Sequence, residues 1–553
     1  MKKVKIFALG GLDENGKNMT VVEVNDVIFI LEAGIKFPNA SQLGVEYVIP
    51  DFDYLIENRK RIAGIFITHA HDDVMRALPY LLKQLRVTIY TGKLTALLIE
   101  DLLKQERIRN YKIEVIKRTS RLIVKGVAIR TFAITHAFPD SFGVAIKSEQ
   151  GYIVYSGEFI VDYNMFHEEF AFDVNEFSKI GSEGVLALLN ESTSAENEGY
   201  TAPKHRITKR LSTIMDRHDG RFIVACYSQS LYRIFEILDI AMKYKKKVFI
   251  RDNEMRKTLE FLNRLGYYKI PKSMLIEKKD FRNDDKNVVI LVTGRGKGLF
   301  LKISTIATHE DTYVEMDGED TVIVTSPVVA GTEKEAVRME NEIYKEGAAI
   351  YTFKGRDVAS MHPSSEDLKM SIFLFKPKYY IPIKGEYRHL IANTRVATNM
   401  GFSQKNILLL DNGQIAQFEG GKIASTKTIL KLEDTLIDGN ENWDVTGVVL
   451  KDRETLSTDG VVIIGVTLDK KTKKIFSGID VQTRGLIYVK DADYLVKEIM
   501  KITSERVESC VKEKRYENLE CRNEIRDKVQ KYLMKETGKR PMVLPVILEI
   551  VDK

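Results

Sequence analysis

The feature that most constrains this chain is the stretch from Ile67 to Pro79, which reads ITHAHDDVMRALP. It follows an apolar, strand-like run at Ile62 to Ile67 and leads into a helix-like run. His69, His71 and Asp73 therefore stand where a strand gives way to a helix. A strand end is rigid and the following loop can turn alternate side chains inward, so these imidazole and carboxylate groups can converge on one divalent metal.

One position of this stretch departs from a complete site. A dinuclear site of this type reads His-x-His-x-Asp-His, and Val74 occupies the place of the last histidine. Two interpretations are open, a working metal site and the remains of one. A third, that these are ordinary polar residues at strand ends, would suit a lone histidine. Two histidines before an acid, with another after a later strand, favour metal binding instead.

Length and composition indicate a soluble protein of several domains. At 553 residues the chain exceeds one hydrophobic core, so about two to four domains are expected. It is 44% hydrophobic and 29% charged, and its net charge of +6 permits a polyanionic partner without requiring one. Only three cysteines occur, without the paired spacing of a zinc ribbon, so a disulfide framework is not expected and a reducing cytosol fits. No apolar run reaches the ~20 residues that span a bilayer, so we expect a cytoplasmic protein without a membrane segment.

Several apolar, strand-like runs end in polar side chains. These are His69, His71, His136, Glu158 and Glu191. An α/β fold places its site at strand ends along one edge, so we expect these side chains to lie together. The three histidines suffice for one tetrahedral metal with an open position. Glu158 is a candidate fourth or bridging ligand, and Asp73 could serve a neighbouring second metal.

From about Pro203 the pattern changes to regular alternation of helices and strands. Such alternation is typical of a parallel sheet covered on both faces. The strands are predicted at Phe222–Ala225, Lys247–Ile250, Val288–Val292, Thr321–Thr325 and Ala348–Tyr351, and the helices at Leu231–Tyr244, Glu254–Leu265 and Glu333–Glu346. After about Met361 the chain returns to the first domain, which makes the middle block an insertion.

The predicted layout thus has one interrupted domain, an insertion and a C-terminal unit. The first domain comprises 1–202 and 358–430, the insertion 203–357, the linker 431–445 and a small α+β domain 446–553. In the last unit we predict strands at Gly460–Leu468, Lys474–Gln482 and Leu486–Tyr488, helices at Asp493–Lys512 and Arg522–Lys535, and a final strand at Met542–Val551.

The chain resembles the RNase J family, β-CASP members of the metallo-β-lactamase hydrolases, from end to end. The opening ALGGLDENGKNM is similar to the family's GG-x-x-E-x-GKNM. Further similar segments are Leu43–Pro50, Thr68–Leu82, Thr135–Ile146, Ser192–Thr201, Lys376–Leu390 and Thr483–Tyr488. The resemblance implies a metallo-β-lactamase αββα sandwich, an inserted β-CASP parallel α/β domain and a small C-terminal α+β dimerisation domain. It also implies RNA cleavage with two zinc or manganese ions, 5′-to-3′ exonucleolytic or endonucleolytic, in RNA maturation and decay.

Relative to the family pattern, the substitutions concentrate at one of the two metal positions. Glu32, Glu158 and Glu191 replace aspartates, and Val74 and Lys384 replace metal-binding histidines. One position keeps ligand-capable residues, His69, His71, His136 and Glu158. The other, with Asp73, has lost two nitrogen ligands, and an ammonium within ~4 Å of a divalent ion costs several kcal/mol. We therefore expect one divalent ion, zinc or manganese, with Lys384 pairing with Asp73 or Glu158 near the lost second site.

The family's phosphate clamp, His-x-Ser-Gly-His, is also altered. It reads Val358-Ala359-Ser360-Met361-His362, which should weaken recognition of a 5′ end most. By resemblance, catalysis is assigned to Asp73, Glu158 and His362. RNA contacts are assigned to Ser360, Met361, His362, Arg295, Lys297, Lys384 and Arg388. For each basic residue singly, a solvated loop or helix face is an equally good interpretation.

Two functions remain open from the sequence. The first is an attenuated metal-dependent ribonuclease, endonucleolytic more readily than 5′-to-3′ exonucleolytic. The second is a largely non-catalytic scaffold that pairs with an active RNase J paralogue. The expected partners are RNA, that paralogue in a hetero-oligomer or a weak homodimer, and an RNA degradosome. Hydrolysis of a small molecule is disfavoured, since the inserted and C-terminal domains match RNA-processing proteins.

Overall fold

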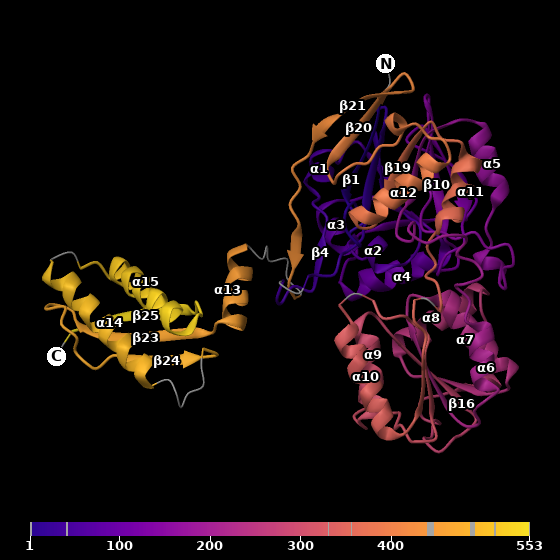
Figure 1. Cartoon of the computed structure of the whole chain (residues 1–553). Coiled ribbons are helices and arrows are strands. Elements are labelled where there is room, and N and C mark those ends of the chain that lie inside the picture. The colour runs from indigo at the N-terminus through magenta and orange to yellow at the C-terminus, as the bar shows by residue number, and fades with distance from the viewer. Residues whose placement is uncertain are drawn as a thin grey trace. The chain divides into compact units, whose positions relative to one another are not determined.

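A computed structural model describes residues 3–39, 42–329, 331–355, 357–439, 447–486, 493–513 and 516–551 (Figure 1). The chain divides into two compact units, and each is described by itself. The first consists of Met1–Phe37 and Val48–Thr435, and the second of Pro38–Tyr47 and Leu436–Lys553. Two short strands, β4 (Tyr47–Ile49) and β22 (Thr435–Ile437), fall where the units meet along the sequence.

Two mixed sheets form the centre of the first unit. The larger has the order β21-β20-β1-β2-β3-β5-β6-β7 and the smaller β19-β12-β11-β10-β9-β8. The larger sheet consists of β1 (Lys3–Gly10), β2 (Met19–Val24), β3 (Val27–Leu31), β5 (Ile62–Ile67), β6 (Thr88–Thr91), β7 (Lys112–Val115), β20 (Gln414–Glu419) and β21 (Lys422–Ile429). The smaller consists of β8 (Arg121–Val124), β9 (Val127–Ala133), β10 (Phe142–Ser148), β11 (Gly151–Tyr155), β12 (Val185–Glu191) and β19 (Tyr379–Ile383).

The main core lies between these two sheets. Phe29 and Phe66 of the larger sheet pack in one buried cluster with Val144, Leu189 and Ile381 of the smaller. A second cluster joins the smaller sheet to α5 and α11 through stacked phenylalanines. The helices of this layer pair are α1 (Asp53–Glu57), α2 (Asp72–Met75), α3 (Leu78–Gln84), α4 (Lys93–Gln105), α5 (Val174–Ser182), α11 (Ser365–Phe375) and α12 (Tyr387–Asn399). The expected αββα sandwich is therefore confirmed.

Turn chemistry fixes the register of the hairpins that frame this sandwich. The β2–β3 hairpin pairs Val24 with Val27 across a two-residue loop, Asn25-Asp26. Both loop residues have positive φ, 49° and 67°. A two-residue hairpin loop requires this backbone, and Asn and Asp tolerate it better than other side chains. The turn thereby sets which strand residues face the core.

The middle of the chain forms a separate parallel sheet within the same unit, in the order β15-β14-β16-β13-β17-β18. One face packs on α9 and α10, and α6 and α7 lie on the other (Figure 1). The strands are β13 (Phe222–Tyr227), β14 (Lys247–Ile250), β15 (Leu275–Ile276), β16 (Val288–Gly294), β17 (Thr321–Val324) and β18 (Ala349–Thr352). The helices are α6 (Thr208–Met215), α7 (Leu231–Lys243), α8 (Asn253–Leu265), α9 (Lys297–Ala307) and α10 (Glu333–Glu346). The predicted strands and helices all form, while α6, α9 and β15 were not predicted.

The second unit is a small α+β fold. Its sheet has the order β24-β23-β25, and a buried cluster joins the sheet to two long helices. The elements are α13 (Gly447–Thr458), β23 (Val461–Asp469), β24 (Asp480–Arg484), α14 (Asp493–Lys512), α15 (Asn518–Thr537) and β25 (Met542–Ile550). The strand predicted at Lys474–Gln482 was wrong for its first half, and α13 was not predicted. Residues 487 and 488 of the strand predicted at Leu486–Tyr488 lie outside the described residues, as do 440–445 of the predicted linker.

Among the described residues, no helix is both long and apolar enough to cross a bilayer.

Candidate metal centre

Four side chains from three strand ends converge at one edge of the sandwich. His69 and His71 follow β5, His136 follows β9 and Glu158 follows β11. Their ligand atoms all lie within 4.8 Å of one another. Except for His71, which is slightly exposed, these side chains are buried. The structure thus brings together the four residues that the sequence assigned to one metal position.

Each imidazole is oriented by an acceptor outside the cluster. His69 Nδ1 lies 2.9 Å from the Thr68 hydroxyl, which itself donates to Glu32. His71 Nε2 donates to the Gln229 carbonyl at 3.2 Å. His136 Nδ1 donates to the backbone carbonyl of residue 361 at 2.8 Å. These bonds fix the tautomers and direct the opposite ring nitrogen of each histidine into the cluster.

The inward nitrogens all face the Glu158 carboxylate. His136 Nε2 lies 3.2 Å from Glu158 Oε2, His69 Nε2 3.4 Å from Oε1 and His71 Nδ1 3.6 Å from Oε2. Burial lowers the pKa values of His69 and His136 well below the ordinary value for histidine. It lowers the pKa of His71 to about 4. All three imidazoles are therefore neutral near pH 7. His69 Nε2 is buried without a hydrogen-bond partner. Neutral nitrogen lone pairs gathered around a carboxylate repel one another unless a cation lies among them, so this set fits a divalent metal.

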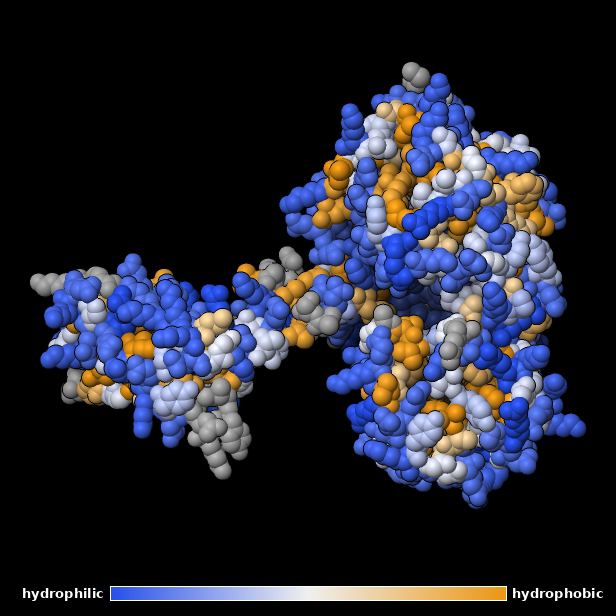
Figure 2. Space-filling view, in the orientation of Figure 1, coloured by the Kyte–Doolittle hydropathy of each residue, from blue (hydrophilic) through white to orange (hydrophobic). Residues whose placement is uncertain are grey.

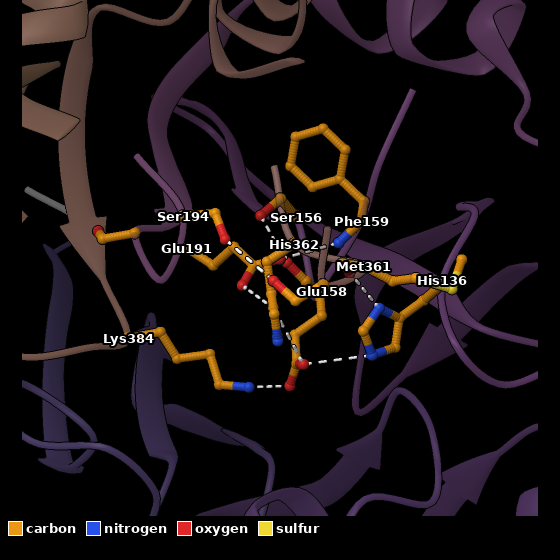
Figure 3. A network of polar contacts seen from close by, with 12 residues as sticks. His136, Ser156, Glu158, Phe159, Glu191, Ser194, Met361, His362 and Lys384 are labelled. Carbon is orange, nitrogen blue, oxygen red and sulfur yellow. Dashed lines mark hydrogen bonds and ion pairs between the residues drawn. The ribbon is translucent and has the colours of Figure 1, made fainter. Parts of the chain in front are cut away.

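The opposite side of Glu158 carries a cation of its own. Lys384 Nζ contacts Glu158 Oε1 (Figure 3). It also lies 3.0 Å from Asp73 Oδ2. Burial favours the neutral form of Asp73, but the Lys384 ammonium and the nearby histidines outweigh it and lower the pKa of Asp73. Val74 is fully buried and offers no ligand atom. The ammonium therefore already compensates the two carboxylates that a second metal would need.

A loop behind the metal motif holds it in place. Thr68 donates to the Glu32 carboxyl through its backbone N–H at 3.1 Å and its hydroxyl at 2.6 Å. Burial raises the pKa of Glu32 to about 8. At Gly34, a Cβ would lie 1.6 Å from the Asp73 carbonyl oxygen, so only glycine permits this approach. The Glu32-Ala33-Gly34 segment thus positions the metal motif from the rear.

A second cluster adjoins the first and consists of Glu158, Glu191 and His362. His362 Nδ1 lies 2.8 Å from Glu191 Oε2 and 3.5 Å from Glu158 Oε2 (Figure 3). Burial disfavours the charged imidazole, yet the Glu191 carboxylate raises the pKa of His362 above its ordinary value. This arrangement leaves His362 Nε2 as the nitrogen that can exchange a proton. Glu191 was recognised in the sequence as a strand-end acid but was not assigned to the site.

The remaining candidate residues divide into those near the cluster and those elsewhere. Ser360 lies 3.2 Å from the Ser194 hydroxyl, and Met361 contributes its carbonyl to His136. Arg295 instead forms an ion pair with Asp72 at 2.9 Å, and Lys297 is an exposed residue in the first turn of α9. Arg388 pairs with Glu196 at 2.7 Å and with Glu386 at 2.9 Å. Of the basic candidates, these contacts place only Lys384 in the cluster.

Sequence reasoning missed the groups that orient the ligands. Thr68 could have been noticed, since a hydroxyl directly before the first histidine is well placed to bond its ring. The carbonyl of Gln229 carries no signal in the sequence, because any residue supplies a carbonyl. Asn18, which donates to Asp73 Oδ2 at 2.9 Å, lies far away along the chain.

The αββα sandwich, the inserted parallel sheet and the strand-end cluster of histidines and acids together define a metallo-β-lactamase-type β-CASP protein. Two family models match, the Ribonuclease J beta-CASP domain at residues 219–343 and the Ribonuclease J C-terminal domain at residues 448–550. The chain belongs to the ribonuclease J family: it is 36% identical over 551 residues to Ribonuclease J 2 of Staphylococcus aureus strain MRSA252, covering 99% of each chain. It is 35% identical, with the same coverage, to Ribonuclease J 2 of Staphylococcus epidermidis.

Among solved structures, the fold is similar to that of a protein of unknown function from Enterococcus faecalis V583. The TM-score is 0.52 at 15% identity, and the match covers 75% of this chain and 100% of the other. At this identity the similarity concerns the fold alone.

Proposed function

We propose that this protein is an RNA phosphodiester hydrolase that uses one divalent ion, zinc or manganese. The ion would be held by His69, His71, His136 and Glu158. The observation that carries the proposal is the asymmetry around Glu158, with neutral nitrogens on one side and the Lys384 ammonium on the other. The names of the relatives support RNA as the substrate class.

When bound, the ion lowers the pKa of a water and polarises a phosphoryl oxygen. The protein's own groups supply the rest of the proposed chemistry. Lys384 provides a fixed positive charge beside Asp73 and Glu158, where a second metal would otherwise offset developing charge. His362, whose pKa Glu191 raises, can hold a proton on Nε2 and release it to the leaving oxygen. Asp73 positions the ammonium.

We also propose that cleavage is attenuated and preferentially endonucleolytic, because the phosphate clamp has lost an imidazole and a glycine. A fixed ammonium does not follow a reacting oxygen as a metal does, so transition-state stabilisation should be weaker. Val358 is buried and carries no imidazole, and the Met361 side chain takes the place of a bare glycine backbone. Capture of a terminal phosphate should therefore suffer more than cleavage inside a strand. Proposed RNA contacts are Ser360, Met361, His362, Lys384, Arg295, Lys297 and Arg388.

The wider assignments are proposals of the same kind. They comprise the domain boundaries at 202/203, 357/358 and 430/446, roles in RNA maturation and decay, a cytoplasmic location, and assembly with a paralogue, a weak homodimer or a degradosome. A second function, a scaffold for an active paralogue, is favoured by one observation. Lys384 contacts both carboxylates that a two-metal mechanism would need free.

Metal counting and RNA cleavage test the proposal together. Purified protein should carry one ion per chain by mass spectrometry and should cut internally in RNA with a labelled 5′-monophosphate. His69→Ala should lose both the ion and cleavage. His309→Ala, which removes an exposed histidine paired with Glu346, is the matched control and should change neither.

Two ions per chain would overturn the one-metal proposal. Equal cleavage by His69→Ala and the unaltered protein would identify a contaminating nuclease and favour the scaffold. Release of mononucleotides from the 5′ end as the main product would contradict the preference for internal cleavage.

A further inference from the structure

A surface pocket lies away from the metal ligands, between α4 of the sandwich and α8 of the inserted sheet. Its volume is about 680 Å³. Besides these two helices, the segment from Arg107 to Tyr111 contributes to its wall. Five basic and two acidic side chains line it, together with the rings of Tyr111 and Phe261. Positive charge and flat rings thus occur in the same hollow.

Among the described residues, one of the five cations that line the pocket takes part in an ion pair. Lys257 pairs with Asp101 across the two helices, which neutralises one cation. Within the described part of the chain, Lys104, Arg107, Arg109 and Arg264 take part in no ion pair. The first three are exposed and follow one another along the end of α4 and the next loop. An anion bound there would meet several cations without displacing an internal partner.

The Phe261 ring is half-buried between cations. The Arg264 guanidinium lies 5.2 Å from its centroid and the Lys257 ammonium 5.9 Å. A base could stack on such a ring, and the flanking cations would then neutralise the phosphates on either side. A ligand that alternates flat rings with negative charges matches this surface better than a compact anion does.

The pocket continues into a cleft that reaches residues next to the metal cluster. The two hollows share Asp101, Lys257 and Phe261 in their walls. The cleft, of about 440 Å³, extends to Ala70, which lies between His69 and His71 in the sequence, and to Gln229, whose carbonyl accepts a hydrogen bond from His71. Figure 2 shows a hydrophilic hollow between the sandwich and the inserted domain.

We propose that the pocket between α4 and α8 is a binding site for single-stranded RNA, holding a segment of the strand outside the one being cleaved. This inference rests on the proposed function, since it takes RNA as the substrate. Lys104, Arg107 and Arg109 contact phosphates, and Phe261 stacks on a base. The site increases the length of RNA that the protein contacts and supplies RNA affinity that the altered phosphate clamp does not.

Salt-dependent binding of labelled, unstructured RNA tests the proposal. The probes are oligomers of about 6 and about 24 nucleotides, followed by fluorescence anisotropy. The variant Lys104→Gln/Arg107→Gln/Arg109→Gln should bind the long RNA at least ~10-fold more weakly, with a salt slope smaller by about 2, since each single-strand phosphate contact contributes roughly 0.7. The short RNA, which we expect to bind through the cleft, should bind unchanged.

Two further variants distinguish RNA binding in this pocket from a general effect of the protein's positive charge. Lys405→Gln/Lys422→Gln/Lys427→Gln removes the same charge from exposed positions outside the pocket and should leave the salt slope within error. Phe261→Leu keeps the apolar packing and removes the stacking face, and should weaken long RNA by roughly 5-fold or more. Equal melting temperatures would verify that each variant is folded.

If the pocket variant and the control variant bind the long RNA alike, the pocket is not an RNA site, and the proposed ribonuclease function is unaffected. Loss of the short RNA as well would show that these residues act through the cleft and would also overturn the inference. If the unaltered protein binds neither RNA, the proposed function itself fails.

Discussion

The two sides of Glu158 differ in the source of their positive charge. On the side of His69, His71 and His136, neutral nitrogens converge and require a cation from outside. On the other side Lys384 brings a cation that is part of the chain. Under the proposed one-ion assignment, this difference explains how a second ion could be lost without leaving buried carboxylates uncompensated.

Removing the internal cation should have the largest effect on stability. Lys384→Met leaves Glu158 and Asp73 without their ammonium, so the metal-free protein should lose about 3–5 kcal/mol of unfolding free energy. Urea unfolding measures this loss. Arg388→Met removes an exposed cation that also bridges two carboxylates and should cost less than about 1 kcal/mol. Similar losses in both variants would contradict a structural role for Lys384.

Substitution of Lys384 together with Val74 should restore a second metal site. Val74→His/Lys384→His returns two nitrogen ligands beside Asp73, so the metal content should rise from one ion to two. The single variant Lys384→Met should stay at one ion, because Val74 offers no ligand. If Lys384→Met alone takes up a second ion, the ammonium was the only obstacle.

Acid should destabilise the histidine side in a defined window. His71 keeps a pKa of about 4 in the folded, metal-free protein, because burial opposes its charge. The unfolded imidazole binds its proton near pH 6.5, so stability is full above that pH and falls as the pH drops toward 4. At about 1.4 kcal/mol per pKa unit, the loss is roughly 3 kcal/mol. His71→Asn should flatten this part of the curve of unfolding free energy against pH, and an unchanged curve would exclude His71 as its source.

Removing the metal should lower the unfolding free energy slightly less than acid does. An ion present at 100 times its dissociation constant contributes about 2.7 kcal/mol, and chelation should remove that amount. Calorimetry with and without chelator measures the difference. In His69→Ala the chelator should have no effect, and a persisting effect would place the ion elsewhere.

The smallest effect is expected from the group that orients His69. Thr68→Val removes the hydroxyl next to Nδ1 and should weaken metal affinity by about 10–100-fold. Thr503→Val is the matched control, because Thr503 is a buried threonine of α14 whose hydroxyl donates to the backbone carbonyl of Ile499. Competition with a metal indicator measures both. Equal affinities would show that burial alone fixes the ring.

The sandwich and the histidine cluster were predictable because local signals carried them. Apolar runs ending in His69, His136 and Glu158 place the side chains at strand ends, and strand ends meet at one edge. Where the signal was local but ambiguous, prediction failed. Helix α9 begins at Lys297 in a glycine-rich segment, which is typical of a loop, yet tertiary packing of its apolar face produces a helix.

Contacts made by the long basic side chains could not be predicted. Arg295 and Arg388 were candidates for RNA contact, but the first pairs with Asp72 and the second with two nearby acids. Such partners depend on how distant segments meet. Lys384 was foreseen beside Asp73 or Glu158 because it occupies a ligand position, and the structure shows it beside both.

The hydrogen bond from His71 to the Gln229 carbonyl bears on whether the parts of this protein can be separated. Gln229 lies in the turn after β13 of the inserted sheet, so a side chain of the sandwich takes its orientation from the insertion. Replacing the insertion with a short linker would remove the carbonyl that holds the His71 ring in place. The insertion is thus a structural part of the metal centre, and domain-by-domain engineering of this protein should keep the two together.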